Sequence, residues 1–135
     1  MKLAAKWQNS WPIDLSAFDA GGSRSSLARL GGELVDVVRV GKGDPLVLVP
    51  GLAGGWRLLM PLARQLARRY EVITYSLRGD GPTAGIGGAS CGVWSIGGHA
   101  ADLKNLIGQL GLENPTVFGV SFGGAVALEL AAESP

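Results

Sequence analysis

The first half of the chain has the hydrophobic pattern of extended strands. The segments Ser26–Leu30 and Glu33–Val40 both suit strands, and Gly31 and Gly32 between them are typical of a tight hairpin turn. Pro45–Val49 is a continuous apolar run, as expected for a parallel strand covered on both faces. We therefore expect an antiparallel hairpin that is followed by a buried parallel strand.

The second half of the chain alternates helical and extended patterns. The expected elements are a helix over Trp56–Arg69, a strand over Glu71–Leu77, a helix over Ser95–Leu110, a strand over Pro115–Val120 and a helix over Phe122–Ala132. This order predicts an α/β fold, with a mostly parallel, doubly wound sheet that opens with the antiparallel hairpin. Residues 1–24 have no clear period and form an unassigned N-terminal extension, and residues 25–135 form the folded unit.

The pentapeptide Gly119-Val120-Ser121-Phe122-Gly123 lies where the last strand meets the last helix. At such a junction Gly-x-Ser-x-Gly is typical of a nucleophile elbow, a sharp turn that exposes the serine hydroxyl at a helix N-terminus. The crowded turn needs glycine two residues before and two residues after the serine. The motif predicts that Ser121 is a catalytic nucleophile and that Gly119 and Gly123 are the elbow glycines.

Composition narrows the possible partners. The chain has 135 residues, is 47% hydrophobic and carries 12 basic against 11 acidic residues, which gives no electrostatic case for nucleic acid. A single Cys and a single His cannot form a metal site from soft ligands, and no segment has the length and apolarity of a membrane span. The N-terminus lacks the apolar segment of a secretory signal, so we expect a cytoplasmic protein. The oligomeric state is left open.

Three motifs, in this order, resemble the N-terminal half of the α/β-hydrolase superfamily over about Ser26–Pro135. They are Val47-Leu48-Val49-Pro50-Gly51-Leu52, which resembles a strand and oxyanion loop, Arg78-Gly79-Asp80-Gly81-Pro82-Thr83, which resembles an Arg-Gly turn, and Gly119 to Gly123, which resembles the elbow. The resemblance implies that the backbone N–H groups of Phe122 and Leu52 form the oxyanion hole. Pro50 stands where many members have a histidine, and Ser76 stands where many have an aspartate, so the subfamily is left open.

The resemblance also implies a reaction. Members that open epoxides have an aspartate at the elbow, whereas Ser121 implies acyl transfer from an ester, thioester, lactone or amide, with a small-molecule acyl substrate and no cofactor. In the family the acid and the His follow the elbow helix, so we expect them beyond Pro135 and expect the 135-residue chain alone to be inactive.

Other residues and functions compete with this interpretation. His99 has the spacing of a residue packed at the edge of the apolar face of its helix, Asp80 suits a turn, and Asp102 suits a solvent-facing helix position. A Rossmann-like nucleotide-binding module is one alternative function, although the loop Gly51–Gly55 lacks the G-x-G-x-x-G order. The other alternative is a non-catalytic binding protein with the α/β-hydrolase fold.

Overall fold

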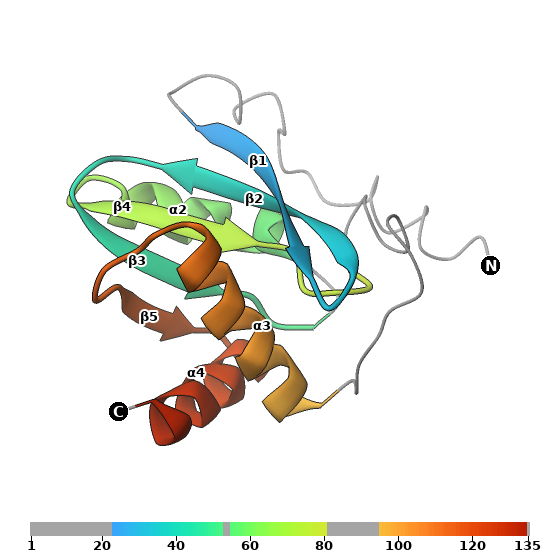
Figure 1. The fold of residues 1–135 in the computed structure, drawn as a ribbon. Coiled ribbons are helices and arrows are strands. Elements are labelled where there is room, and N and C mark those ends of the chain that lie inside the picture. The colour runs from blue at the N-terminus through green and yellow to red at the C-terminus, as the bar shows by residue number, and fades with distance from the viewer. Residues whose placement is uncertain (1–22, 53–54, 81–94, 135) are drawn as a thin grey trace.

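The computed structural model describes residues 23–52, 55–80 and 95–134, in which a sheet lies between two layers of helices (Figure 1). Its elements, in chain order, are β1 (Arg24–Leu30), β2 (Glu33–Val40), β3 (Asp44–Val49), the 3-10 helix η2 (Trp56–Leu59), α2 (Met60–Leu66), β4 (Tyr70–Tyr75), α3 (Ile96–Gln109), β5 (Thr116–Gly119) and α4 (Phe122–Glu133).

The strand order across the sheet is β1-β2-β4-β3-β5. β1 and β2 form the expected antiparallel hairpin, with positive φ at both Gly31 and Gly32 of its turn, and β2 continues antiparallel to β4. β3 pairs in parallel with β4 on one side and with β5 on the other. The predicted sheet is therefore confirmed, with an antiparallel hairpin at one edge and a parallel remainder.

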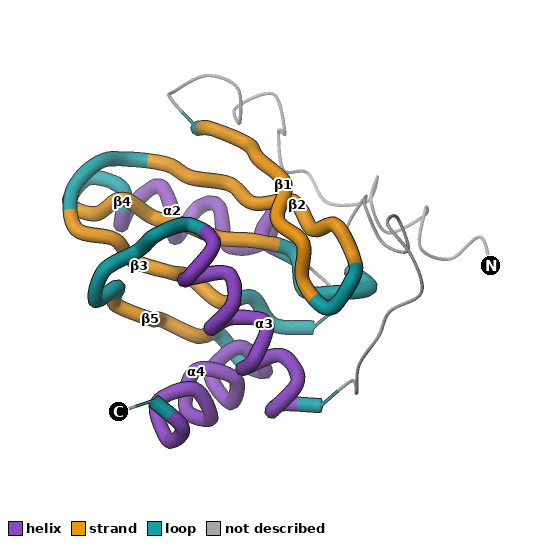
Figure 2. The backbone as a smooth tube through the Cα atoms, in the orientation of Figure 1, coloured by secondary structure: helices purple, strands orange, loops and turns teal. Residues whose placement is uncertain are grey.

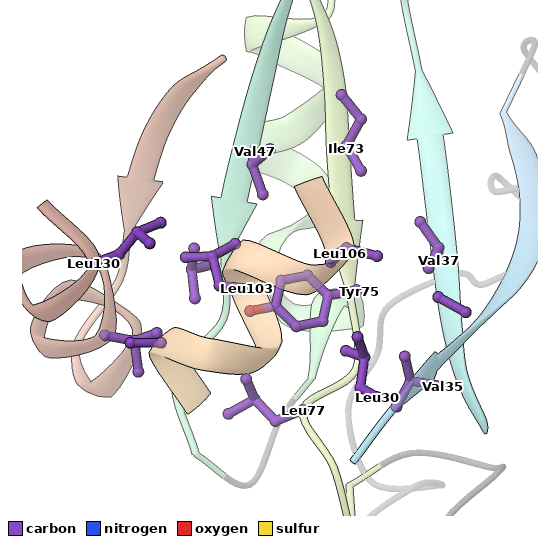
Figure 3. Packing of buried hydrophobic residues seen from close by; sticks show 14 residues of the cluster. Leu30, Val35, Val37, Val47, Ile73, Tyr75, Leu77, Leu103, Leu106 and Leu130 are labelled. Carbon is purple, nitrogen blue, oxygen red and sulfur yellow. The ribbon is translucent and has the colours of Figure 1, made fainter. Parts of the chain in front are cut away.

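Each face of the sheet has its own core. Val47, Ile73 and Tyr75 lie on the face covered by α3 and α4, where Leu103 and Leu106 of α3 pack against them (Figure 3). The opposite face is covered by η2 and α2; its buried residues include Val38, Leu46, Leu48, Trp56, Leu59, Met60, Ala63 and Val72. Successive strand residues point to opposite faces, so a strand that is apolar throughout can serve both cores.

Local sequence explains where several elements begin and end. The hydroxyl of Ser95 accepts a hydrogen bond from the N–H of Gly98 at 3.0 Å, which caps α3. Gly111 follows α3 with a φ of 62°, a conformation that favours glycine. The predicted helix over Trp56–Arg69 is shorter and divided, because a 3-10 turn precedes α2 and Leu66 ends it. Most of the N-terminal extension, the loop 81–94 and Cys91 lie outside the described residues.

Candidate active site

Ser121 occupies a strained turn between β5 and α4. Its φ is 54° and its ψ is −119°, and its side chain does not cap the helix that begins at the next residue. Among the described residues Asn114 is the other non-glycine residue with a positive φ. Such a conformation costs about 1–3 kcal/mol and persists only where the surrounding structure enforces it. The strained position of Ser121 is therefore imposed by its neighbours.

The two elbow glycines supply that constraint. A Cβ atom on Gly119 would lie 2.1 Å from the carbonyl oxygen of Gly123, and one on Gly123 would lie 2.3 Å from the carbonyl oxygen of Val49. Real Cβ atoms essentially never approach a backbone atom below 3.0 Å, so both positions require glycine. At Gly124 the nearest contact would be an ordinary 3.5 Å. Within the elbow, the steric need for glycine thus falls on the two motif positions and not on Gly124.

Two backbone hydrogen bonds complete the turn. The N–H of Gly123 donates to the carbonyl of Val120 at 2.9 Å, and that of Gly124 donates to the carbonyl of Ser121 at 2.8 Å. Phe122 is the first residue of α4, where an N–H has no acceptor within the helix and the helix dipole favours negative charge. This is the environment expected of an oxyanion donor.

The loop that follows β3 lies against the elbow. A Cβ atom on Gly51 would lie 3.4 Å from the Cβ of Ser121 and 3.9 Å from its Oγ. Val120 donates its N–H to the carbonyl of Val49 at 3.1 Å, which holds the ends of the two strands together. Leu52, the second predicted donor, follows Gly51 directly and is 63% exposed. The structure thus brings the predicted nucleophile beside the predicted oxyanion loop.

His99 is buried in α3, directly beside the elbow. It is 3% exposed, and its ring meets that of Phe122 edge to face, with 5.4 Å between the centroids and 88° between the planes. Burial lowers the pKa of His99, and the positive charge of Arg78 acts in the same direction, while Asp102 opposes both. The expected packing role of His99 is confirmed.

Asp102 departs from its predicted solvent-facing position. It is 7% exposed, and its Oδ2 accepts a hydrogen bond from Nε of Arg78 at 2.6 Å, within a buried ion pair. Its Oδ2 is also 3.8 Å from Nδ1 of His99, one helical turn earlier. Asp102 shares the inward face with His99 and Leu106, a spacing that was visible in the sequence. The prediction was wrong because a buried carboxylate is unusual unless it has a partner, and the partner is distant in sequence.

The β1–β2 hairpin clamps the Arg-Gly turn from the other side. Glu33 accepts a hydrogen bond from the N–H of Gly79 at 2.8 Å, and a Cβ atom on Gly31 would lie 2.3 Å from the guanidinium of Arg78. Figure 2 shows the hairpin turn beside the loop that follows β4. Nothing local in the sequence indicated these contacts between the hairpin and the Arg-Gly turn.

Tyr75 of β4 lies in the same core. Burial raises the pKa of its hydroxyl far above the usual range, and the negative charge of Asp102 acts in the same direction.

The family follows from a comparison with known proteins. A family profile described as "alpha/beta hydrolase fold" matches residues 44–135, which include β3, the Arg-Gly turn and the elbow. The chain belongs to the α/β-hydrolase family. The resemblance inferred from the three motifs is therefore confirmed, as is the fold.

Alignments with individual proteins cover most of this chain. It is 32% identical over 127 residues to the polyketide synthase ThaQ of Burkholderia thailandensis, an alignment that covers 90% of the chain and 6% of that protein. It is 35% identical over 111 residues to the 2-hydroxy-6-oxo-2,4-heptadienoate hydrolase of Pseudomonas putida, which covers 78% of the chain and 38% of that enzyme. The solved structure of the epoxide hydrolase CorEH without ligand superimposes with a TM-score of 0.74 at 28% identity, over 83% of the chain and 38% of that structure.

This α/β-hydrolase chain thus spans well under half the length of each of these proteins. Within the described residues, no cluster of three His, Cys, Asp or Glu side chains could hold a metal ion. In the same part of the chain, no helix has the length and hydrophobicity needed to cross a bilayer. The catalytic roles of Ser121, Phe122 and Leu52 stay predictions, which the geometry now makes specific.

Proposed function

We propose that this protein is a serine hydrolase that forms an acyl-enzyme on Ser121. The observation that carries the proposal is the strained φ of Ser121 between two glycines that no other residue can replace. Strain of this kind gathers at functional sites, because folding alone rarely selects it. The substrate class is a small molecule with an ester, thioester, lactone or amide carbonyl.

The reaction has two steps. Oγ of Ser121 attacks the carbonyl carbon and passes its proton to a histidine, while the N–H groups of Phe122 and Leu52 bind the developing oxyanion. The tetrahedral intermediate collapses, and the leaving group departs with that proton. Water, deprotonated by the same histidine, then attacks the acyl-enzyme and releases the acid and the free hydroxyl of Ser121.

Epoxide opening is the competing activity, since several of the similar structures are described as epoxide hydrolases. A serine that opened an epoxide would form an ether, which water does not cleave, whereas a carboxylate nucleophile forms an ester that water can cleave. Ser121 therefore favours a carbonyl substrate.

The histidine and acid of the mechanism are proposed to lie beyond residue 135. His99 packs its ring on Phe122 in the core, and Asp102 is already paired with Arg78, so neither is placed for the triad. The alignment with the hydrolase relative covers 38% of that enzyme, so most of the enzyme has no counterpart in this chain. The 135-residue chain alone should then show only the small residual rate that oxyanion donors can support. A cytoplasmic location stays a prediction of the sequence.

A comparison of substrates tests the proposal. The complete gene product should hydrolyse p-nitrophenyl acetate, and Ser121→Ala should reduce that rate to background, whereas styrene oxide should not be opened. The 135-residue chain is the matched control and should be near background. Ester hydrolysis that survives Ser121→Ala, or efficient opening of the epoxide, would contradict the proposed chemistry. Tight substrate binding without turnover would instead support the non-catalytic alternative.

A further inference from the structure

The loop after β3 begins beside Ser121, and the first large side chain described beyond it is that of Trp56. At the first end Gly51 packs on Ser121, and the paired ends of β3 and β5 fix its backbone. The side chain of Leu52 is largely exposed and adds little packing. Residues 53 and 54 of the loop lie outside the described part of the chain, and Trp56, just beyond the loop, begins η2.

Trp56 makes a side-chain hydrogen bond to β2. Among the described contacts, no other residue of η2 does so. The residue is 7% exposed within the core under η2 and α2, and the guanidinium of Arg57 lies 4.6 Å from the centroid of its ring. Its indole Nε1–H donates a hydrogen bond to Oδ2 of Asp36, in the middle of β2. The contact joins the end of the loop to a strand twenty residues earlier.

Within the described part of the chain, the carboxylate of Asp36 has few other partners, which makes this hydrogen bond important to it. Its carboxylate forms no ion pair among the described residues, and its buried Oδ1 has no hydrogen-bond partner there. Its backbone carbonyl accepts a hydrogen bond from the N–H of Ser76 at 3.0 Å, which ties the same residue to the end of β4. A partly buried carboxylate needs a donor, and a hydrogen bond to an ionised acceptor is stronger than one between neutral groups.

We propose that Trp56 and Asp36 form a positioning pair that holds the oxyanion loop in place. The inference rests on the proposed function, since it concerns how the N–H of Leu52 is aligned with the oxyanion. Neither side chain touches the reacting atoms; the pair acts through the loop. Without the hydrogen bond, we expect Trp56 to be held less firmly at its end of the loop, while Gly51 stays against Ser121.

The expected effect is smaller than the loss of a donor. Removing one oxyanion donor typically lowers kcat by about 10²–10³-fold, and a misplaced donor retains part of its effect. We expect Trp56→Phe, which keeps an aromatic ring and removes the N–H, to lower kcat of the complete gene product by about tenfold. Since the contact acts in the transition state, kcat and kcat/KM should fall together while KM stays within about twofold.

A double-mutant cycle provides the test. Trp56→Phe and Asp36→Ala should each lower kcat, and combining them should lower it no further, because both remove the same hydrogen bond. Asp36→Asn keeps an acceptor oxygen and should recover most of the activity. Met60→Ala truncates a buried residue of the same core that makes no polar side-chain contact with β2, so it should lower the unfolding midpoint but leave kcat unchanged.

The outcomes separate this inference from the proposed function. A wild-type protein that a fluorophosphonate does not label on Ser121 would overturn the proposed function. If the wild type is labelled and active, and Trp56→Phe has the same kcat as the wild type, the positioning role alone would be overturned. The positioning role would also be overturned if Met60→Ala lowered kcat as much as Trp56→Phe, or if the two losses in the cycle simply multiplied.

Discussion

Two neighbouring strand ends supply the candidate site, and they are held by different means. The end of β5 turns into α4 through contacts between backbone atoms, with Gly119 and Gly123 packed too closely for any side chain. The end of β3 leads into a loop, and just beyond that loop the indole of Trp56 donates a hydrogen bond to Asp36 of β2. We infer that the first turn depends on the absence of side chains and the second on a contact between two of them.

The difference between backbone and side-chain contacts indicates which positions of the site can accept a substitution. Backbone sterics leave no alternative to glycine at the elbow, whereas a side-chain hydrogen bond can be replaced by another donor and acceptor. The Arg-Gly turn after β4 belongs to the second class, because Asp102 and Glu33 hold it from distant elements. Substitutions in the two classes should therefore differ in whether a second substitution can compensate for the first.

The largest effect is expected where a side-chain contact is also a buried ion pair. Asp102→Ala leaves the guanidinium of Arg78 buried without this carboxylate, and should reduce the free energy of unfolding by about 3–5 kcal/mol. Replacing both partners, as Arg78→Met with Asp102→Leu, should recover much of that loss. Urea denaturation of the complete gene product measures both; a double variant no more stable than Asp102→Ala would show that the turn has no replaceable contact.

The elbow should behave in the opposite way. Gly123→Ala places a Cβ atom 2.3 Å from a backbone oxygen, and should cost about 3 kcal/mol with no compensating substitution nearby. Gly124→Ala is the matched control, because its Cβ has an ordinary contact and alanine favours the helix by up to about 1 kcal/mol. Equal unfolding free energies for the two variants would contradict steric enforcement of the elbow.

A smaller effect concerns His99 beside Phe122. Because its pKa is lowered by burial, the unfolded chain takes up a proton on this residue at a higher pH than the folded protein does. Its contribution to stability is present above about pH 6.5, the ordinary value, and is lost as the pH falls through the lowered pKa. The free energy of unfolding should drop between about pH 7.5 and 5.5 by more in the wild type than in His99→Asn. Equal drops in the free energy of unfolding for the two proteins would mean that His99 takes up a proton as readily in the folded protein as in the unfolded chain.

The same contrast, between local backbone geometry and contacts of distant side chains, explains which features could be predicted from the sequence. All five strands, the hairpin and the elbow were predicted, because hydrophobic runs and glycine positions report local geometry. The contacts of Trp56 with Asp36 and of Arg78 with Asp102 were not, because they join residues 20 and 24 positions apart. Asp102 was assigned to a solvent-facing position, although its spacing from His99 and Leu106 placed it on the buried face. The remainder of the site depends on such distant pairs.

The most direct test of the account is covalent labelling of the complete gene product with a fluorophosphonate, followed by peptide mapping. A phosphonate resembles the tetrahedral intermediate and reacts with a serine that has both a base and oxyanion donors. We predict one adduct, on Ser121, that disappears in Ser121→Ala and persists in His99→Ala. An adduct on a different serine, or labelling lost in a folded His99→Ala variant, would contradict it.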